Sequence, residues 1–295
     1  MAMDHSQSRR AFLRASLGAC AASLLDHELL AADSRPDAAK ELDFPLVDLH
    51  VHLDNSTIDQ VLPLARGRKV KFGIVEHAGT RENIYPVVIS NDDELRAYVN
   101  KLKGRDLYKG VQTEWTDWVQ CFSRKTLALL DYVLTDAMTF PGKDGKRVKL
   151  WEKQAEERVD MSNHQAFMDR LVDWNVQIIN RQPIDILANV SWLPAPLAND
   201  YDRLWTDARV TKVIDAAVKR RVAIEISSSF RLPKLRFLRI AKEAGAKFTF
   251  GSNGRYPQMG LLEYSIATAK ELGLKRTDMF TPAPDGQKAV QRRGD

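Results

Sequence analysis

Two closely spaced histidines, His50 and His52, are the part of this chain best suited to chemistry. They end the apolar segment Leu46-Val47-Asp48-Leu49-His50-Val51-His52. Side chains alternate between the faces of a strand, so both imidazoles are expected to point the same way, where they can hold a metal ion. A second apolar segment, Phe72-Gly73-Ile74-Val75, leads directly into Glu76-His77. The spacing predicts a metal centre at the mouth of a barrel.

Polar side chains follow the other apolar segments as well. Parallel βα barrels carry their reactive groups at the carboxyl ends of the strands. In chain order these ends carry His50, His52 and Asp54, then Glu76 and His77, Glu114, Asp136, Asn189, Ser227 and Ser228, and finally Asn253 and Arg255. We therefore expect these side chains to meet in one site.

The elements that must position these residues alternate along the chain. Short apolar runs predict seven strands, at 44–50, 72–76, 108–113, 132–134, 184–190, 222–226 and 248–250. Stretches with helical spacing lie between most of them, at 92–102, 167–179, 210–218, 235–244 and 261–272. Strands alternating with helices predict an α/β fold, a single-domain TIM-like parallel barrel over residues 43–275.

Local signals mark the boundaries of these elements. Ser56-Thr57-Ile58-Asp59 predicts a helix start, and Gly245 and Gly273 stand where helices should end. The long connection 136–163 contains an Asp144-Gly145 pair that predicts a hairpin, and we interpret it as a lid over the mouth. Residues 276–295 have the composition of a poorly ordered tail.

The first 32 residues resemble a twin-arginine export signal rather than part of the fold. Arg9 and Arg10 precede a short apolar stretch, 15–25, and small residues follow at Ala31-Ala32. The stretch is too short to span a membrane. We therefore expect recognition by the twin-arginine export machinery and a periplasmic or extracellular protein with no stable membrane span. An amphipathic helix at the start of a cytoplasmic domain is the alternative, and Leu17-Gly18-Ala19-Cys20 also resembles a lipoprotein cleavage box that would anchor the chain at Cys20.

The composition bounds the partners of the protein. The 295 residues carry a formal net charge of +5, and the basic residues are scattered rather than interleaved with aromatic residues in one stripe. We expect no nucleic acid and instead a small, anionic substrate. Removal of the signal would leave Cys121 as the remaining cysteine, so the mature chain has no internal disulfide.

Several motifs together resemble the PHP family, named for polymerase and histidinol phosphatase. The matching segments are Asp48-Leu49-His50-Val51-His52, Gly73-Ile74-Val75-Glu76-His77, Gly110-Val111-Gln112-Thr113-Glu114, Asp131-Tyr132-Val133-Leu134, Asp185-Ile186-Leu187, Ile224-Glu225-Ile226 and Phe250-Gly251-Ser252-Asn253-Gly254-Arg255. The resemblance covers residues 43–272, and its first two motifs are the most specific. It implies a distorted (β/α)7 barrel with a two- or three-metal site that hydrolyses phosphoesters.

The chain also departs from the family pattern at several ligand positions. Glu76 replaces an aspartate, Met138 stands near an expected histidine, and Asn189 replaces a histidine. The last motif reads Asn253-Gly254-Arg255 where the family has Asp-Ala-His. An amide in place of an anion and a permanent cation in place of an imidazole both weaken metal binding, so a full three-metal centre is not expected.

The remaining ligands suffice for one or two divalent ions, either Zn, Mn or Fe. His50, His52 and Glu114 supply two imidazoles and a carboxylate, and His77 either completes a second site or acts as general acid and base. Asp54 is a second candidate catalytic residue, as orienter or substrate contact. We expect Arg255, Asn189 and Asn253 to bind the substrate, and the alternative for Arg255 is an ion pair with Glu225 or Asp54.

These residues predict a metal-dependent hydrolase of the PHP type that acts on phosphoesters of a small substrate. The alternative is a non-catalytic or repurposed barrel that binds a sugar or anionic small molecule, with Trp115 and Trp118 as stacking platforms. Hydrolysis of a carbon–nitrogen bond is a third hypothesis, because a His-x-His site at a barrel mouth also resembles the amidohydrolases. Asn253 stands where those enzymes carry an aspartate and argues against it.

Overall fold

A closed parallel barrel forms the centre of the part of the chain that the structure describes. The structure is a computed structural model and describes residues 42–54 and 56–292. Within these residues seven strands pair in the order β1-β10-β9-β8-β5-β4-β2, and β1 pairs with β2 to close the ring. The strands are β1 (Val47–Val51), β2 (Lys71–Ala78), β4 (Tyr108–Thr113), β5 (Tyr132–Asp136), β8 (Ile186–Ala188), β9 (Ala223–Ser227) and β10 (Phe248–Gly251). The predicted seven-strand α/β barrel is confirmed.

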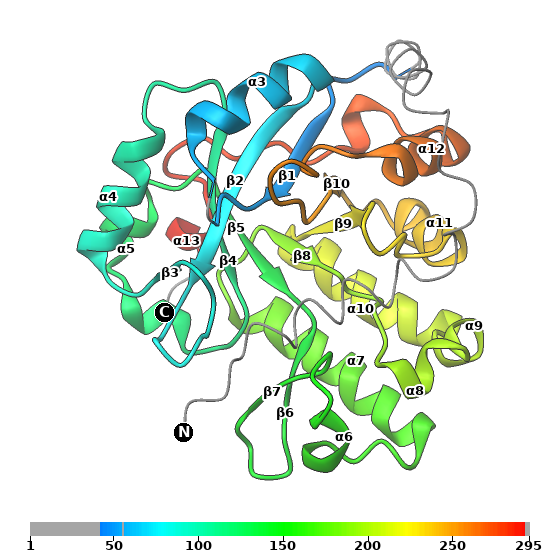
Figure 1. Ribbon diagram of the computed structural model, residues 1–295. Coiled ribbons are helices and arrows are strands. Elements are labelled where there is room, and N and C mark those ends of the chain that lie inside the picture. The colour runs from blue at the N-terminus through cyan, green and yellow to red at the C-terminus, as the bar shows by residue number, and fades with distance from the viewer. Residues whose placement is uncertain (1–41, 55, 293–295) are drawn as a thin grey trace, which may run out of the picture. The chain divides into compact units, whose positions relative to one another are not determined.

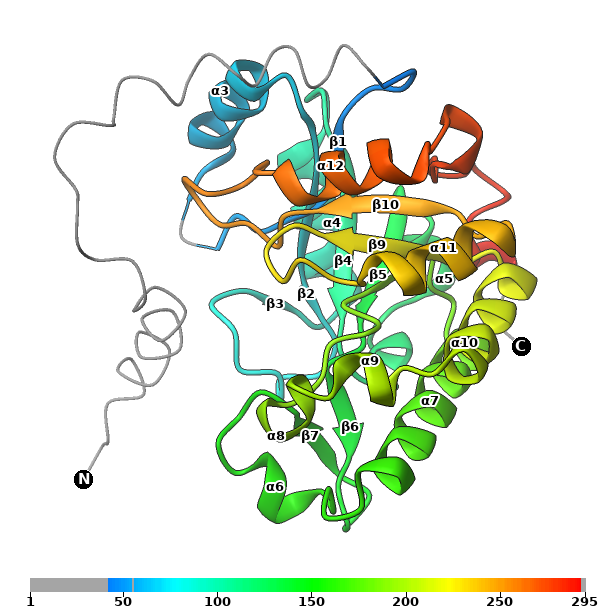
Figure 2. The ribbon, with the colours of Figure 1, turned by 90° about the vertical axis from the view of Figure 1, so that its right-hand side faces the viewer.

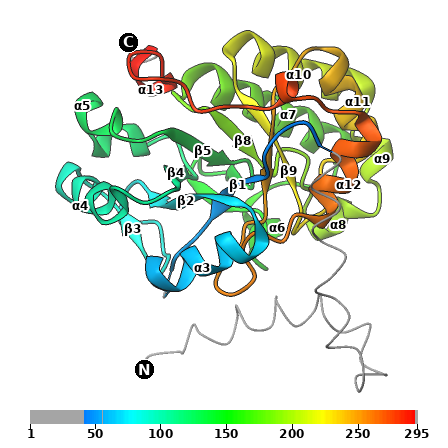
Figure 3. The ribbon, with the colours of Figure 1, turned by 90° about the horizontal axis from the view of Figure 1, so that it is seen from above.

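Helices lie outside the ring of strands, as the view from above shows (Figure 3). The longer ones are α3 (Ile58–Arg68), α4 (Asp92–Leu102), α7 (His164–Arg181), α10 (Asp207–Arg220), α11 (Leu235–Glu243) and α12 (Glu263–Leu272). The predicted start of α3 is confirmed, with Thr57 as the N-cap and Gln60, rather than Asp59, completing the capping box. Gly273 ends α12 in the left-handed conformation, with a φ of 59°.

Shorter elements fill the connections between these strands and helices. They are β3 (Val88–Ile89), η1 (Trp118–Cys121), α5 (Arg124–Leu127), α6 (Ala155–Arg158), α8 (Ala195–Ala198), α9 (Tyr201–Leu204) and η2 (Arg276–Asp278). The hairpin predicted from Asp144-Gly145 is present, because β6 (Thr139–Pro141) pairs antiparallel with β7 (Arg147–Lys149). This hairpin and α6 lie below the barrel strands in Figures 1 and 2.

A register shift in β1 determines where the two histidines point. Asp48 pairs with Phe72 of β2, whereas Val51 pairs with Ile74, so β1 holds one extra residue between the two pairings. An extra residue of this kind is a β-bulge, which changes the alternation of side chains along a strand. Leu49 therefore belongs to the small core inside the barrel, while the next residue, His50, contacts side chains at the mouth.

Tyr132 fills the inside of the barrel beneath the mouth. Its ring is 1% exposed, and its hydroxyl donates to the Leu49 carbonyl at 2.8 Å. Two glycines on neighbouring strands leave room for the ring: a Cβ at Gly110 would lie 2.5 Å from Cζ of Tyr132, and one at Gly73 would lie 2.4 Å from its hydroxyl oxygen. The barrel is thus a packed core with its reactive groups confined to one end.

The C-terminal residues that the structure describes are folded, so the prediction of a poorly ordered tail is wrong for 276–292. The Phe280 amide donates to the Phe248 carbonyl at 2.9 Å, and Met279 forms an isolated bridge with Phe248, so this segment is tied to the start of β10. The final helix α13 (Ala289–Arg292) buries Ala289 and Val290. The buried carboxylate of Asp185 accepts from the Ala289 amide, at 3.3 Å. Apolar anchors within a polar sequence explain why composition alone misjudged this segment.

Two further sequence-based predictions concern the export segment and membrane spans. The twin-arginine segment 1–32 and Cys20 lie outside the described residues. Among the helices of residues 42–54 and 56–292, none has the length and apolar character needed to cross a membrane.

Candidate metal centre at the barrel mouth

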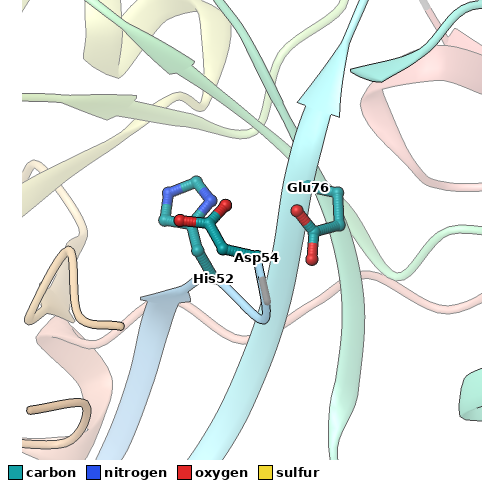
Figure 4. Close-up of side chains that lie close together, drawn as sticks. All are labelled: His52, Asp54 and Glu76. Carbon is teal, nitrogen blue, oxygen red and sulfur yellow. The ribbon is translucent and has the colours of Figure 1, made fainter. Parts of the chain in front are cut away.

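Three side chains with metal-binding atoms meet where β1 and β2 end. They are His52, Asp54 and Glu76, and one ligand atom of each lies within 4.8 Å of the others. Figure 4 shows the three side chains gathered beside the end of β1 and across β2. His52 and Glu76 are buried, and the Asp54 side chain is 13% exposed. This His/Asp/Glu cluster could hold a metal ion.

Each of these three side chains carries buried atoms without a hydrogen-bond partner. They include both ring nitrogens of His52, Oδ1 of Asp54 and Oε2 of Glu76. Among the described residues fourteen buried side-chain atoms lack a partner, and eight of them belong to the mouth, namely to His52, Asp54, Glu76, His77, Asn189 and Glu225. Buried polar atoms without partners are costly, so their concentration here fits a site that receives a cation.

The electrostatics of the cluster also favour a cation. Burial lowers the pKa of His52 well below its usual value, and the nearby Arg255 and His77 lower it further, so the ring is neutral and its lone pair is available to a metal. Burial, reinforced by Asp54, raises the pKa of Glu76 to about 7. A divalent ion between these groups would offset both the burial and the repulsion of the two carboxylates.

Arg255 holds Asp54 in place through the carboxylate oxygen Oδ2, which is not the unpartnered one. Its Nε donates to Oδ2 of Asp54 at 2.8 Å, and its Nη1 donates to the carbonyl and side-chain oxygens of Asn253 at 3.0 Å. Asp54 and Asn253 both adopt positive φ values, 46° and 47°. Two roles were predicted for Arg255, substrate binding and an ion pair. The ion pair with Asp54 is present, while 43% of the Arg255 side chain stays exposed.

Asp48 ties the end of β1 to the loop after β10. Its Oδ1 accepts from the amides of His50 and Ser252, at 3.1 and 3.0 Å. Its Oδ2 accepts from the Ser252 hydroxyl and, at 2.9 Å, from the Gly260 amide. Burial raises the pKa of Asp48 to about 6, against the effect of these donors. Both oxygens of this carboxylate therefore have partners, and Asp48 holds the backbone at His50 against the loop after β10.

His50 has partners on both ring nitrogens, unlike His52. Nδ1 lies 2.6 Å from Oε2 of Glu225, and Nε2 lies 2.8 Å from Oε1 of Gln112. Burial opposes the charged ring, but the Glu225 carboxylate outweighs it, so the pKa of His50 is raised. The sequence predicts His50 as a metal ligand, and in the structure both of its nitrogens face protein oxygens.

His77 and Glu114 lie beside the cluster, under an aromatic cover. The His77 ring stacks on His52, with centroids 4.8 Å apart, and on Tyr85, with centroids 3.5 Å apart. Its Nδ1 lies 3.1 Å from Oε1 of Glu114, without the alignment of a hydrogen bond. Burial lowers the pKa of His77, although Glu114 opposes this, so the ring is neutral. Lys149 of the hairpin covers Tyr85, with Nζ 4.1 Å from the ring centre.

Asp136 and Asn189 occupy the far side of the mouth. Nδ2 of Asn189 donates to Oδ2 of Asp136 at 3.0 Å, and Oδ1 of Asn189 has no partner. Burial, with repulsion from Glu114, raises the pKa of Asp136 to about 7. Asn189 has a φ of 54°, an unusual conformation for a residue other than glycine, and it presents its amide oxygen inside the barrel end.

The structure brings the predicted strand-end residues into one region but groups them differently from the sequence. His52 and Asp54 cluster with Glu76, whereas Glu114 contacts His77 and the Tyr85 hydroxyl. Sequence reasoning gave Glu76 no role as a ligand and passed over Tyr85 and Gln112. The alternation of β2 places Glu76 and His77 on opposite faces, and only the loop after β1, which reaches over the strand, returns Glu76 to the site.

The two tryptophans suggested as stacking platforms pack within the fold. Trp118 is 1% exposed, and its ring nitrogen donates to Gln182 at 3.0 Å. Trp115 packs against Trp174, with ring centroids 5.2 Å apart. Trp118 is therefore buried in the core, which removes it as a sugar platform.

Comparisons with known proteins do not assign a family. No family model matches the chain, and no curated protein matches it. Fourteen chains of known structure match, among them one described as the crystal structure of an uncharacterized protein. That protein is 9% identical, with a TM-score of 0.29, and the match covers 82% of this chain and 77% of that chain. A likeness this low carries no inference about function.

Proposed function

We propose that this protein is a metal-dependent hydrolase of the PHP type that cleaves phosphoesters of a small, anionic substrate. The observation that carries the proposal is the cluster of His52, Asp54 and Glu76 at the barrel mouth, in which one ligand atom of each side chain lies within 4.8 Å of the others. Each of the three side chains also carries a buried atom without a hydrogen-bond partner. The resemblance of the strand-end motifs to the PHP family supports the reaction class, and the closed seven-strand barrel agrees with the fold that this resemblance implies.

One imidazole and two carboxylates suit a divalent Zn, Mn or Fe ion. When bound, such an ion would supply Lewis-acid polarisation of the phosphoester and make water easier to deprotonate. Asp54 would hold the ion through Oδ1, because Oδ2 is held by Arg255. Glu76 would hold it through Oε2, because Oε1 accepts from the Leu53 amide at 3.2 Å. Three protein ligands would leave room for substrate and water.

His77 is the residue that we expect to move the proton. Its ring is neutral and stacks on His52, and both of its nitrogens lack a hydrogen-bond partner. A neutral imidazole accepts a proton from water and returns it to the leaving oxygen. Glu114, 3.1 Å from Nδ1, would stabilise the imidazolium that forms.

Arg255 and Asn189 are the groups that we expect to bind the substrate. The Arg255 guanidinium is fixed by Asp54 through Nε and by Asn253 through Nη1, so Nη2 takes no part in these contacts. A guanidinium held in this way binds a phosphate oxygen with little further ordering. The unpartnered Oδ1 of Asn189 can accept from a substrate hydroxyl. Asn253 then acts on the substrate through Arg255.

The proposal extends to the destination of the protein. The twin-arginine segment predicts export, to the periplasm or beyond, after the chain has folded. This would let the metal be chosen inside the cell. The segment lies outside the described residues, so its recognition stays a prediction from the sequence.

The test compares metal content and phosphoesterase activity in four full-length proteins. Wild type, His52→Ala and Glu76→Gln are dialysed against Mn²⁺ or Zn²⁺ and analysed by elemental mass spectrometry, with His164→Ala as the control. His164 is partly exposed at the start of α7 and forms no part of the mouth. Glu76→Gln keeps the side-chain volume and removes the negative charge. Activity is followed with p-nitrophenyl phosphate and bis-p-nitrophenyl phosphate.

We expect about one equivalent of metal in wild type and in His164→Ala, and none in His52→Ala. Glu76→Gln should weaken metal binding, because it removes the negative charge of one of the three ligands. Phosphoester hydrolysis should disappear with the metal. A wild-type protein that binds no metal even at saturating metal concentration would contradict the proposal. It would favour the repurposed barrel that binds an anionic small molecule. Full hydrolysis by His52→Ala would contradict the assigned site.

A further inference from the structure

Gln112 lies at the centre of one half of the mouth, which His50, Glu114 and Asp136 complete. It comes from β4 and is 4% exposed. Its Oε1 lies 2.8 Å from Nε2 of His50, and its Nε2 donates to Oε1 of Glu114 and Oδ2 of Asp136, both at 3.4 Å. One neutral amide group therefore contacts three side chains, from the ends of three different strands.

The three neighbours of Gln112 are of the types that bind metals. An imidazole nitrogen and two carboxylates around a common point form the usual ligand set of a divalent ion. In this protein that common point is filled by the amide, and each of the atoms facing it has a partner. By contrast, both ring nitrogens of His52, Oδ1 of Asp54 and Oε2 of Glu76 have no hydrogen-bond partner. The two halves of the mouth thus share ligand types and differ in what lies between them.

An ion could enter the Gln112 half only by breaking all three contacts of the amide. It would also leave the buried amide without partners, at a cost of about 1–3 kcal/mol for each group left unsatisfied. His50 is held on its other side by Glu225, at 2.6 Å, which fixes the ring toward Gln112. Asp136 is held by the Asn189 amide and by the Met138 backbone amide, at 3.0 and 2.8 Å. The surroundings reinforce the position of the amide.

We propose that the side chain of Gln112 takes the place of a second metal ion, so that the mouth binds a single ion at His52, Asp54 and Glu76. Gln112 is then the residue that sets the metal stoichiometry, and His50 lies outside the coordination sphere. The inference rests on the proposed function only in that the His52 half binds a metal. It predicts that a carboxylate at this position, next to Glu114 and Asp136, requires a cation to offset the repulsion.

The experiment measures metal stoichiometry in wild type, Gln112→Glu and Gln112→Met. Each full-length protein is dialysed to equilibrium against Mn²⁺ or Zn²⁺ and analysed for metal per chain, and thermal unfolding confirms that each is folded. Gln112→Glu changes the charge with almost no change in shape. Gln112→Met is the matched control, because it fills the same space and adds no ligand charge. His52→Ala tests whether any ion remains in the Gln112 half.

We expect the metal content to rise from about one equivalent in wild type to about two in Gln112→Glu, and to stay at about one in Gln112→Met. His52→Ala should bind none. Two ions in wild type, an ion retained by His52→Ala, or an unchanged content in folded Gln112→Glu would each overturn the inference. A wild type that binds no metal overturns the proposed function as well. One ion without phosphoester hydrolysis overturns the proposed activity alone.

Discussion

His50 and His52 are two residues apart on one strand, and their surroundings are opposite. His50 has a carboxylate on one nitrogen and an amide oxygen on the other, and its pKa is raised. His52 has no hydrogen-bond partner on either nitrogen, and its pKa is well below the usual value. Since a neutral imidazole is the form that binds a metal, these two identical residue types are suited to different tasks.

The His50–Glu225 pair leads to a prediction about stability. Glu225→Gln keeps the shape and removes the negative charge 2.6 Å from the buried ring, so the pKa of His50 should fall and unfolding should become easier by about 1–3 kcal/mol. A raised histidine pKa stabilises the fold at low pH and loses this effect as the pH rises, so the loss in the variant should be larger at pH 6 than at pH 9.

Urea unfolding at the two pH values measures this effect. The matched control is Glu271→Gln, which breaks an exposed ion pair with Arg239 and should cost less than about 0.5 kcal/mol. Equal costs for the two variants would show that the buried pair contributes nothing beyond a surface contact.

Among the secondary-structure elements, the barrel strands carry glycines where the Tyr132 ring fills the inside of the barrel. β2 and β4 each carry a glycine beside the Tyr132 ring, and the bulge in β1 turns His50 toward the mouth. Tyr85, from the loop after β2, stacks on His77, and Lys149 at the end of β7 lies over the Tyr85 ring. The strands thus fix the ligands, and the connections cover them.

The glycine on β4 can be tested directly. In Gly110→Ala the new Cβ would lie 2.5–2.9 Å from three atoms of the Tyr132 ring, which is fully buried and cannot move aside. We expect a loss of about 1–3 kcal/mol in the free energy of unfolding. The control is Gly67→Ala in α3, where a Cβ meets nothing within 4 Å and should stabilise the helix by about 0.5–1 kcal/mol. Denaturant unfolding of both variants distinguishes crowding from backbone effects, and a neutral Gly110→Ala would contradict the packing account.

At the scale of the whole molecule, burying titratable groups at one end of the barrel makes stability depend on pH and metal. The pKa of Glu76, about 7, lies above its ordinary value of 4.5. Ionisation of the buried Glu76 therefore lowers the free energy of unfolding. This loss is absent below about pH 4.5, grows as the pH rises and is complete above about pH 7, at roughly 3 kcal/mol. The low pKa of His52 acts in the opposite direction, since stability is lost as the pH falls below 6.5.

A bound divalent ion should therefore stabilise the protein more at high pH than at low pH. At pH 8 Glu76 is already ionised and gains the ion as a partner, whereas at pH 5.5 the ion must first displace a proton. We expect the increase in melting temperature on adding Mn²⁺ to be larger at pH 8 than at pH 5.5, measured by differential scanning calorimetry. In Glu76→Gln the difference between the two pH values should shrink. A larger increase at pH 5.5 would contradict the assignment of Glu76.

The fold class and the region of the site could be predicted from the amino-acid sequence alone. The seven strands follow from short apolar runs, and polar residues at their ends follow from the rule that parallel strands present their carboxyl ends together. These signals are local, so they can be read without knowing how the strands pair. His52 and Asp54 were identified in this way.

Which side chains contact one another at the mouth depends on how the strands pair and where the loops lie. Glu76 reaches the cluster because the loop after β1 lies over β2, and Gln112 reaches His50 because a bulge alters the alternation of β1. Neither follows from residue spacing, because partners on different strands depend on the register of the closed ring. The folded tail at 276–292 has the same cause, since its apolar anchors become visible only against the barrel that buries them.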